Sequence, residues 1–329
     1  MRIVGLEEHF VTAEVLEAWR ALDPQWQDIA LKPSAEGASA RRLAELGGER
    51  FAAMDETGLD VQVLSLTTPG VQNLAPADAV ALQRASNDLL ADTVRAHPDR
   101  LQGLATLATP APAEAAHELE RTVTGLGLNG AMLSGRTRER NLDHPDFWPI
   151  FEAAAALKAP LYLHPQSPPP TVRAAYYHGF DDSMDAAFAT YGIGWHYDTG
   201  VQLVRLILSG VLDRFPDLQV IVGHWGEVVL FYLDRIEKLA RAAKLARPVS
   251  DYVRSNVLVT PSGIFSQRYL RWAIEIVGVE RILFSTDYPF EFAPQGGARR
   301  FLDKADLTDG DRENIASGNW DRLCTGIRR

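Results

Sequence analysis

The feature that most constrains this chain is a repeated alternation between short apolar runs and longer helical patterns. Eight apolar, β-branched runs occur along its 329 residues. They cover residues 3–9, 61–66, 101–107, 129–133, 160–164, 218–224, 256–260 and 281–287. Runs of this length that alternate with helices predict parallel βαβ units. Eight such units predict an α/β fold in which the strands close into a (β/α)8 TIM barrel.

The segments between the runs carry the helical pattern. Apolar residues recur there at spacings of three and four, which is typical of amphipathic helices. The pattern predicts helices over residues 76–97, 112–125, 147–157, 199–215 and 227–246. An open, doubly wound sheet is the alternative fold. It would show a glycine-rich phosphate loop after an early strand, and the sequence has none.

A single domain is expected to span residues 1–329, because barrels of this kind often reach that length. Two connections, at about residues 10–60 and 165–198, are too long to be plain loops and are expected to be insertions. Long connections at one end of a barrel usually carry function. We therefore predict that residues 165–198 cover the pocket and set substrate choice, with Gly179, Gly192 and Gly194 as hinges.

Charge and composition exclude several classes of partner. The net charge is −10 and no basic run offsets it, so neither nucleic acid nor an anionic membrane surface is an expected partner. No stretch of eighteen uncharged apolar residues occurs, and the first residues lack a signal-peptide pattern, so a cytoplasmic protein is expected. The one cysteine, Cys324, can form neither an intramolecular disulfide nor a cysteine-based metal site.

Metal-competent side chains fall at the ends of several predicted strands. Glu7 and His9 lie two residues apart in the first run and therefore share a face, which Ile3 and Gly5 are expected to share as the barrel interior. The other such residues are His164, His224 and Asp287, which end the fifth, sixth and eighth runs. The carboxyl ends of barrel strands converge on one mouth. Nitrogen and oxygen ligands placed there suit Zn²⁺, Mn²⁺ or Mg²⁺.

A lone histidine at a strand end is more often a hydrogen-bonded core residue than a ligand. Several such residues at strand ends together favour a metal centre. Three other histidines, His97, His117 and His144, fit surface or capping positions. His178 and His196 lie in or beside the connection after the fifth run, and the sequence leaves open whether either reaches the site.

Four motifs resemble those of one enzyme family. They are LEEHF at residues 6–10, YLHP at 162–165, GHWGE at 223–227 and FSTDYPFE at 284–291. In order and spacing they resemble the amidohydrolase-superfamily decarboxylases, over nearly the whole chain. That group includes γ-resorcylate, 2,3-dihydroxybenzoate and 5-carboxyvanillate decarboxylases and is related to aminocarboxymuconate-semialdehyde decarboxylase. Hydrolytic members commonly open with His-x-His, whereas Glu7-x-His9 resembles the aromatic-acid decarboxylases.

The resemblance implies roles for individual residues. Those matching the family's metal ligands are Glu7, His9, His164 and Asp287, which would hold one divalent ion, Mn²⁺ or Zn²⁺ with Mg²⁺ possible. His224 and Glu227 match a pair close to the substrate, and Arg235 stands where the family has an arginine near the site. The chain departs from several aromatic-acid decarboxylases at Gln166, where they have an arginine, so substrate identity stays open.

The expected activity is non-oxidative, metal-dependent decarboxylation of a hydroxylated aromatic carboxylic acid of the γ-resorcylate, 2,3-dihydroxybenzoate or salicylate type. Asp287 is the expected general acid, and His224, oriented by Glu227, would hold the carboxylate or relay a proton. Four aromatic residues beside these positions are candidates for an apolar wall around the ring, although ordinary core packing explains them equally well. They are Phe10, Trp225, Tyr288 and Phe290.

Two other functions remain open from the sequence. A metal-dependent hydrolase, such as a lactonase or amidohydrolase, would use the same site to activate water, with Asp287 as the base. A barrel that binds a metal or ligand without catalysis is the third possibility, since fold does not decide function. The expected partner is a small aromatic carboxylate, and the family resemblance implies a homodimer or homotetramer.

Overall fold

Parallel strands form the centre of the molecule in the computed structural model, which describes residues 1–329. The strands are β1 (Val4–Phe10), β2 (Val61–Leu66), β3 (Leu101–Gly103), β4 (Ala105–Thr106), β5 (Ala131–Ser134), β8 (Leu161–His164), β9 (Val220–Val222) and β10 (Val257–Val259). They pair in the orders β1-β2-β3 and β4-β5-β8-β9-β10. A separate hairpin joins β6 (Arg136–Thr137) to β7 (Arg140–Asn141).

Residues 282–285 close the ring of strands. Ile282 bridges to Val259 of β10, and Ser285 bridges to Leu6 of β1, both in parallel. On the other side of the ring, one residue, Leu104, separates β3 from β4. Each of the eight predicted runs therefore contributes to the barrel, and the predicted α/β barrel fold is confirmed. The alternative open sheet is wrong because its two edges are joined.

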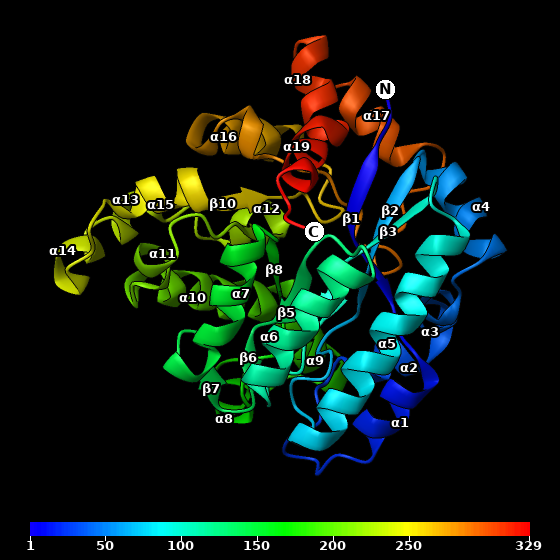
Figure 1. Ribbon diagram of the computed structural model, residues 1–329, viewed down its shortest axis with the longest axis vertical. Coiled ribbons are helices and arrows are strands. Elements are labelled where there is room, and N and C mark those ends of the chain that lie inside the picture. Colours follow the sequence, from blue (N-terminus) through cyan, green and yellow to red (C-terminus); the bar gives the residue numbers. More distant parts are fainter.

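Helices surround the strands (Figure 1). The α-helices that follow the first three strand positions are α1 (Ala13–Arg20), α2 (Leu31–Ala35), α3 (Gly37–Ala44), α4 (Gly48–Thr57), α5 (Pro76–Ala96) and α6 (Pro112–Glu120). Next come α7 (Trp148–Leu157), α8 (Pro170–Tyr176), α9 (Asp182–Ala187), α10 (Gly194–Leu208), α11 (Val211–Arg214) and α12 (His224–Glu227). The last are α13 (Leu233–Ile236), α14 (Leu239–Ala243), α15 (Val249–Asn256), α16 (Gln267–Val277), α17 (Gly297–Asp303), α18 (Asp309–Glu313) and α19 (Asn319–Thr325). Short 3-10 or π-helical turns are η1 (Arg121–Gly125), η2 (Pro145–Phe147), η3 (Phe188–Gly192), η4 (Val279–Arg281) and η5 (Asn314–Gly318).

The predicted helix over residues 227–246 is wrong in its form. The pattern predicts a continuous helix over residues 227–246, whereas the chain forms α12, α13 and α14 separately. Trp225, Gly226, Glu227 and Val228 have φ angles of 59°, 89°, 51° and 60°. This left-handed conformation cannot continue a right-handed helix, so the apolar spacing that follows cannot start at Glu227.

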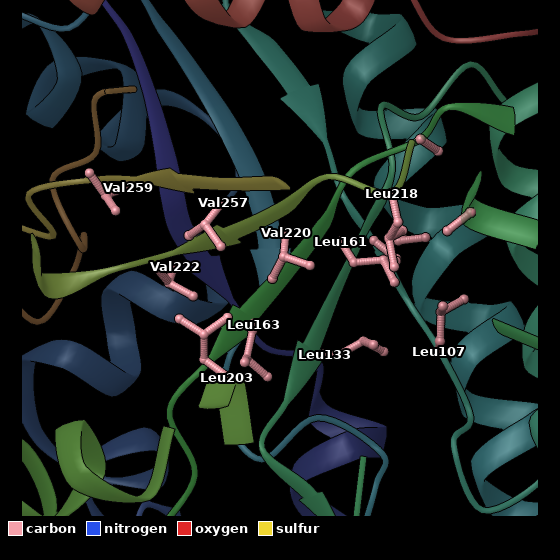
Figure 2. Packing of buried hydrophobic residues seen from close by; sticks show 14 of the residues in the cluster. Leu107, Leu133, Leu161, Leu163, Leu203, Leu218, Val220, Val222, Val257 and Val259 are labelled. Atoms are coloured by element: carbon pink, nitrogen blue, oxygen red, sulfur yellow. The ribbon is translucent and has the colours of Figure 1, made fainter. Parts of the chain in front are cut away.

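Successive strand residues face opposite layers of core. Leu161, Leu163, Val220 and Val222 point outward and pack with residues such as Leu203 of α10 (Figure 2). The strand residues between these outward-facing ones point into the barrel and belong to a cluster that we call the inner core. It consists of Val4, Leu6, Val61, Val63, Leu104, Met132, Tyr162, Ile221, Leu258, Leu283 and Trp320. The alternation follows from the two-residue period of a strand.

The expected face of β1 is wrong at its start. Ile3 packs in the larger cluster between strands and helices, which includes Leu161 and Val220 and which we call the outer core. Val4 and Leu6 lie in the inner core instead. The pairing of β1 with β2 shifts between Gly5 and Glu8, and Glu7 has a φ of 59°. Such a bulge inserts one residue into the strand, so that the residues beyond it face the opposite side from the one that simple alternation predicts. Glu7 consequently reaches the inner core, where it contacts Tyr162.

The two long connections carry short helices and contact one another. Residues 10–60 include α1 to α4, and residues 165–198 include α8, α9 and η3. The hydroxyl and backbone N–H of Ser167 both donate to Asp28. Two cavities of about 440 and 460 Å³ lie where these connections meet, and Arg173 lines both. No helix has the length and apolar character required to span a membrane.

Candidate metal centre and active site

Four side chains converge at the carboxyl end of the barrel. They are Glu7 and His9 of β1, His164 at the end of β8, and Asp287 two residues beyond the strand segment 282–285. Their ligand atoms all lie within 4.8 Å of one another. His9 Nε2 is 3.4 Å from Asp287 Oδ1, and His164 Nε2 is 3.4 Å from Glu7 Oε1. The structure thus brings together the four residues predicted as ligands.

The atoms that face the centre of this cluster are free to bind a metal. Glu7 Oε1 and His9 Nε2 are buried and have no hydrogen-bond partner. His164 Nδ1 lies 2.9 Å from the carbonyl oxygen of Pro165, so Nδ1 must carry the proton and Nε2 a lone pair. Buried polar atoms without partners are costly. A cation at the centre would satisfy these atoms, so the donor set fits a divalent metal.

Hydroxyl groups of the barrel interior hold the other side of Glu7. Its Oε2 accepts from Tyr162 Oη at 2.6 Å, from Ser285 Oγ at 3.3 Å and from Ser262 Oγ. His9 Nδ1 lies 3.3 Å from Ser65 Oγ. Each group is therefore anchored on one side and presents its other side to the cluster, as outer partners of metal ligands do.

Burial and charge shift the pKa values of this cluster in directions that suit a cation. Burial lowers the pKa of His164 to about 3, which keeps it in its neutral, metal-binding form. Burial also raises the pKa of Glu7, because removing the carboxylate from water costs more than the nearby His224 and His9 offset. Burial would raise the pKa of Asp287 too, but His224 and His9 outweigh burial and hold it well below its ordinary value.

His224 and Glu227 form a hydrogen-bonded dyad beside this cluster. His224 Nδ1 is 2.7 Å from Glu227 Oε1, and His224 Nε2 is 3.9 Å from Asp287 Oδ2. Glu227 is completely buried. Residues 224–228 do not form an ordinary right-handed helical turn, since they turn in the left-handed sense. That turn still brings the Glu227 carboxylate back to the ring three residues earlier.

The dyad is strongly polarised. Although burial opposes it, the charge of Glu227, with Asp287 and Glu7, raises the pKa of His224 well above its ordinary value. Burial would likewise raise the pKa of Glu227, but His224 and His196 lower it to about 2. These charges favour the protonated form of His224, whose Nε2 side faces Asp287.

Among the predicted aromatic residues, Phe290 packs against the cluster, with its ring centroid 5.9 Å from that of His9. Phe10 and Trp225 pack in the outer core, and Trp225 Nε1 donates to the Ile264 carbonyl at 2.8 Å. The Tyr288 ring lies under the guanidinium of Arg50, 5.0 Å away. Substrate contact by these aromatic residues stays a prediction.

Arg235, the remaining predicted substrate residue, is exposed on α13. Gln166 is buried and engaged on both sides. It accepts from the Arg136 backbone N–H at 2.8 Å and donates to Asn73 Oδ1 at 3.1 Å. Its amide therefore braces the loops beyond the strands. A role for Arg235 in substrate binding stays a prediction as well.

The two histidines left open by the sequence lie in different environments. His178 is exposed and bonds Asp185 through Nδ1 at 2.6 Å. His196 reaches the dyad, with Nδ1 2.9 Å from Glu227 Oε2. Sequence reasoning had placed it beside the long connection without a partner. Its spacing from Glu227 along the chain contains no signal of this contact.

Further residues that support the site were missed. Tyr162 could have been found, because it alternates with the outward Leu161 and Leu163 and so must face the barrel interior. Arg50 is fully buried and donates to the backbone oxygen of His9 at 2.7 Å. Glu8 accepts from the Thr286 backbone N–H at 2.8 Å and fastens β1 to the segment that carries Asp287. Ser262 and Arg50 come from loops and helices whose position the sequence pattern does not predict.

The fold and the cluster define a barrel enzyme with a metal-binding mouth, and comparison with known families agrees. Residues 9–323 match the family described as Amidohydrolase, so the chain belongs to that family. This confirms the resemblance drawn from the four motifs.

Several relatives of matching length are decarboxylases. The γ-resorcylate decarboxylase of Polaromonas sp. (strain JS666) is 34% identical over 337 residues, which cover 97% of each chain. The solved structure of 5-carboxyvanillate decarboxylase from Sphingomonas paucimobilis is 35% identical, with a TM-score of 0.89, and the match covers 98% of this chain and 99% of that one. The dihydroxybenzoic acid decarboxylase of Polaromonas sp. JS666, solved with manganese and 2-nitroresorcinol, is 32% identical, with a TM-score of 0.84 and coverage of 98% and 97%.

Proposed function

We propose that this protein is a metal-dependent carboxy-lyase that releases CO2, without oxidation, from a hydroxylated aromatic carboxylic acid. The observation that carries the proposal is the site itself: a four-residue donor cluster with unpartnered buried atoms, next to a polarised His224–Glu227 dyad. Relatives that cover the whole chain decarboxylate γ-resorcylate or 5-carboxyvanillate, which supports this reaction class. The substrates that we propose are of the γ-resorcylate, 2,3-dihydroxybenzoate or salicylate type.

One divalent metal would be held by Glu7, His9, His164 and Asp287. Manganese is supported by the related structures that contain it, and the nitrogen and oxygen donors also suit zinc or magnesium. When bound, the metal supplies a Lewis acid that holds the carboxylate and the neighbouring hydroxyl of the substrate.

The chemical problem is the electron pair left when a carboxylate leaves an aromatic ring. Protonation of the ring carbon that bears the carboxylate makes the ring an electron sink. The C–C bond then breaks, its electron pair returns to the ring, and CO2 departs. The net change consumes one proton and replaces the carboxylate with hydrogen.

Asp287 and His224 are the proposed source of that proton. Asp287 is the cluster residue that faces the dyad: its Oδ1 is 3.4 Å from His9 Nε2, and its Oδ2 is 3.9 Å from His224 Nε2. Asp287 is ionised in the free enzyme, but a bound anionic substrate adds negative charge beside it and favours its protonation. His224 can then pass the proton from Nε2 to Asp287, which delivers it to the ring carbon.

Exposed aromatic side chains support the expected homo-oligomer. Phe231 and Tyr232, just before α13, are 71% and 45% exposed, and Tyr197 of α10 is 44% exposed. Aromatic residues are enriched at the cores of subunit interfaces. Arg235 lies on α13, which begins directly after Tyr232. A homodimer or homotetramer formed through this surface is therefore part of the proposal, and Arg235 would act across such an interface.

The experiment that tests the function combines metal analysis with a screen for CO2 release over ortho-hydroxybenzoates. We expect about one equivalent of divalent metal, CO2 release from at least one of these acids, and one deuterium on the vacated carbon when the reaction runs in D2O. High bicarbonate with the phenol product should drive carboxylation, because each step is reversible. An enzyme that releases no CO2 but opens lactones or amides in an Asp287-dependent way would be a hydrolase.

A further inference from the structure

His196 touches the acid–base dyad from an element outside the barrel. It lies in the first turn of α10, near the end of the connection formed by residues 165–198. Its Nδ1 is 2.9 Å from Glu227 Oε2, while His224 Nδ1 is 2.7 Å from Glu227 Oε1. The two imidazole centroids are 4.5 Å apart. Glu227 is thus a buried carboxylate with a histidine on each oxygen.

The packing of α10 against α12 builds this contact. A Cβ on Gly200 would lie 2.4 Å from the Glu227 carbonyl oxygen, so the two elements approach as closely as a glycine permits. His196 precedes Gly200 by four residues and lies on the same face of the helix. Two further contacts fix this first turn: Trp195 Nε1 donates to Ser167 Oγ at 3.1 Å, and Asp198 pairs with Arg136 at 3.3 Å.

Both ring nitrogens of His196 face oxygen acceptors. Nε2 lies 3.1 Å from the backbone oxygen of Tyr191, which can only accept. Nδ1 lies 2.9 Å from a carboxylate oxygen of Glu227. These two contacts hold the imidazole ring in one orientation against the buried carboxylate.

We propose that His196 is a positioning residue for the reaction, acting through Glu227 on His224. Because His196 is hydrogen-bonded to Oε2, the Glu227 carboxylate is held in the orientation in which its Oε1 faces His224 Nδ1. That bond in turn directs His224 Nε2 towards Asp287. Without His196, the carboxylate would hold a buried, unpaired oxygen and could rotate away from the ring. The proposal rests on the proposed decarboxylase function, and it assigns His196 no contact with the substrate.

The same three residues could in principle hold a second metal, since their ligand atoms lie close together. The geometry favours hydrogen bonds instead. Both Nδ1 atoms lie at N–H···O distances from the Glu227 oxygens, and His196 Nε2 is taken by Tyr191. At the metal cluster, in contrast, Glu7 Oε1 and His9 Nε2 have no partner.

The test compares His196→Leu, which removes the donor, with His196→Asn, whose amide nitrogen can replace Nδ1. The matched control is His178→Leu, because His178 is an exposed histidine of the same connection. We expect His196→Leu to lose about 10- to 100-fold in kcat with little change in KM or metal content, the range seen when a supporting partner is removed. His196→Asn should recover most of that loss, and His178→Leu should resemble the wild type.

Proton and nitrogen NMR of the zinc-loaded enzyme gives a readout that needs no activity. The low-field signal of the His224 Nδ1–H proton should vanish or shift in His196→Leu and persist in His196→Asn and His178→Leu. If the wild type decarboxylates nothing, the proposed function fails, while this signal still decides the positioning role.

Three results would overturn the inference. His196→Asn could be as impaired as His196→Leu with equal losses of thermal stability, which would mean simple packing. His196→Leu could keep wild-type kcat and an unchanged His224 signal. The wild type could bind two equivalents of metal and His196→Leu only one, which would make the three residues a metal site.

Discussion

The two halves of the active centre are held in place by different parts of the fold. Glu7, in the proposed ligand cluster, is held by Tyr162 and Ser262 from the barrel. Glu227, in the dyad, is held on its outer oxygen by His196 at the end of a long connection. The helices of that connection, α8 and α9, contain no buried residue. Metal geometry therefore depends on the core of the barrel, whereas acid–base geometry depends on an insertion.

The largest effect is expected inside the ligand cluster. His164→Ala removes a buried nitrogen that faces Glu7 Oε1 and leaves three of the four donors. We expect loss of most bound metal and of all measurable activity, as determined by metal analysis and CO2 release. His144→Ala is the control, because His144 is exposed and caps the short helix η2. A full equivalent of metal in His164→Ala would contradict the ligand assignment.

A change in the dyad should separate turnover from metal binding. His224→Asn keeps a polar side chain but loses the group that faces Asp287. We expect metal content near that of the wild type and a fall in kcat of about 10²- to 10⁴-fold, the usual contribution of a positioned acid or base. Steady-state kinetics and metal analysis on the same preparation check this. If metal is lost together with activity, His224 belongs to the ligand cluster instead.

The support of the cluster by the barrel can be tested at Tyr162. Tyr162→Phe removes the hydroxyl that donates to Glu7 Oε2 at 2.6 Å but keeps the ring in the inner core. We expect metal affinity to fall by about 10- to 100-fold, measured by competition with a chelator. Tyr252→Phe removes another buried hydroxyl, bonded to Asp213 outside the site, and should leave metal affinity unchanged. Equal affinity in both variants would show that the barrel does not tune the metal.

The same contrast explains what could be predicted from sequence. The length of an apolar run and the spacing of its apolar residues locate strands well, and the predicted run 61–66 coincides with β2. The convergence of Glu7, His9, His164 and Asp287 followed from parallel strands ending at one mouth. The reasoning for Glu7 was nevertheless wrong in one step, because a bulge, and not simple alternation from Ile3, brings it into the barrel. A bulge of this kind has no signature in the spacing of apolar residues along the sequence.

The dyad and its support were harder to predict because they depend on loops. The left-handed turn from His224 to Val228 breaks the helix that the spacing predicts. His196 lies 31 positions from Glu227, and only the close packing at Gly200 joins them. Side chains placed by irregular backbone depend on tertiary contacts that a single sequence does not encode as a pattern.

The smallest expected effect concerns the junction between the connection and α10. A Cβ at Gly194 would lie 2.2 Å from the carbonyl oxygen of Ala189, so Gly194→Ala must push η3 away from the start of α10. His196, two residues on, would shift with it, while the ligand cluster on the barrel would not. We expect a modest fall in kcat of up to about 10-fold and altered KM ratios among hydroxybenzoates, with unchanged metal content. The clash should also reduce the free energy of unfolding by about 1–3 kcal/mol.

Gly125→Ala is the matched control for this junction. Gly125 ends the π-helical turn η1, whereas Gly194 begins α10 just after η3, and a Cβ on Gly125 would meet nothing within 4 Å. It should therefore change neither kinetics nor unfolding by more than a few tenths of a kcal/mol. If Gly194→Ala loses stability yet keeps wild-type kcat and the same preference among substrates, residues 165–198 do not control the dyad. If it loses metal as well, the ligand cluster and the insertion are coupled, and the division between the two halves of the site is wrong.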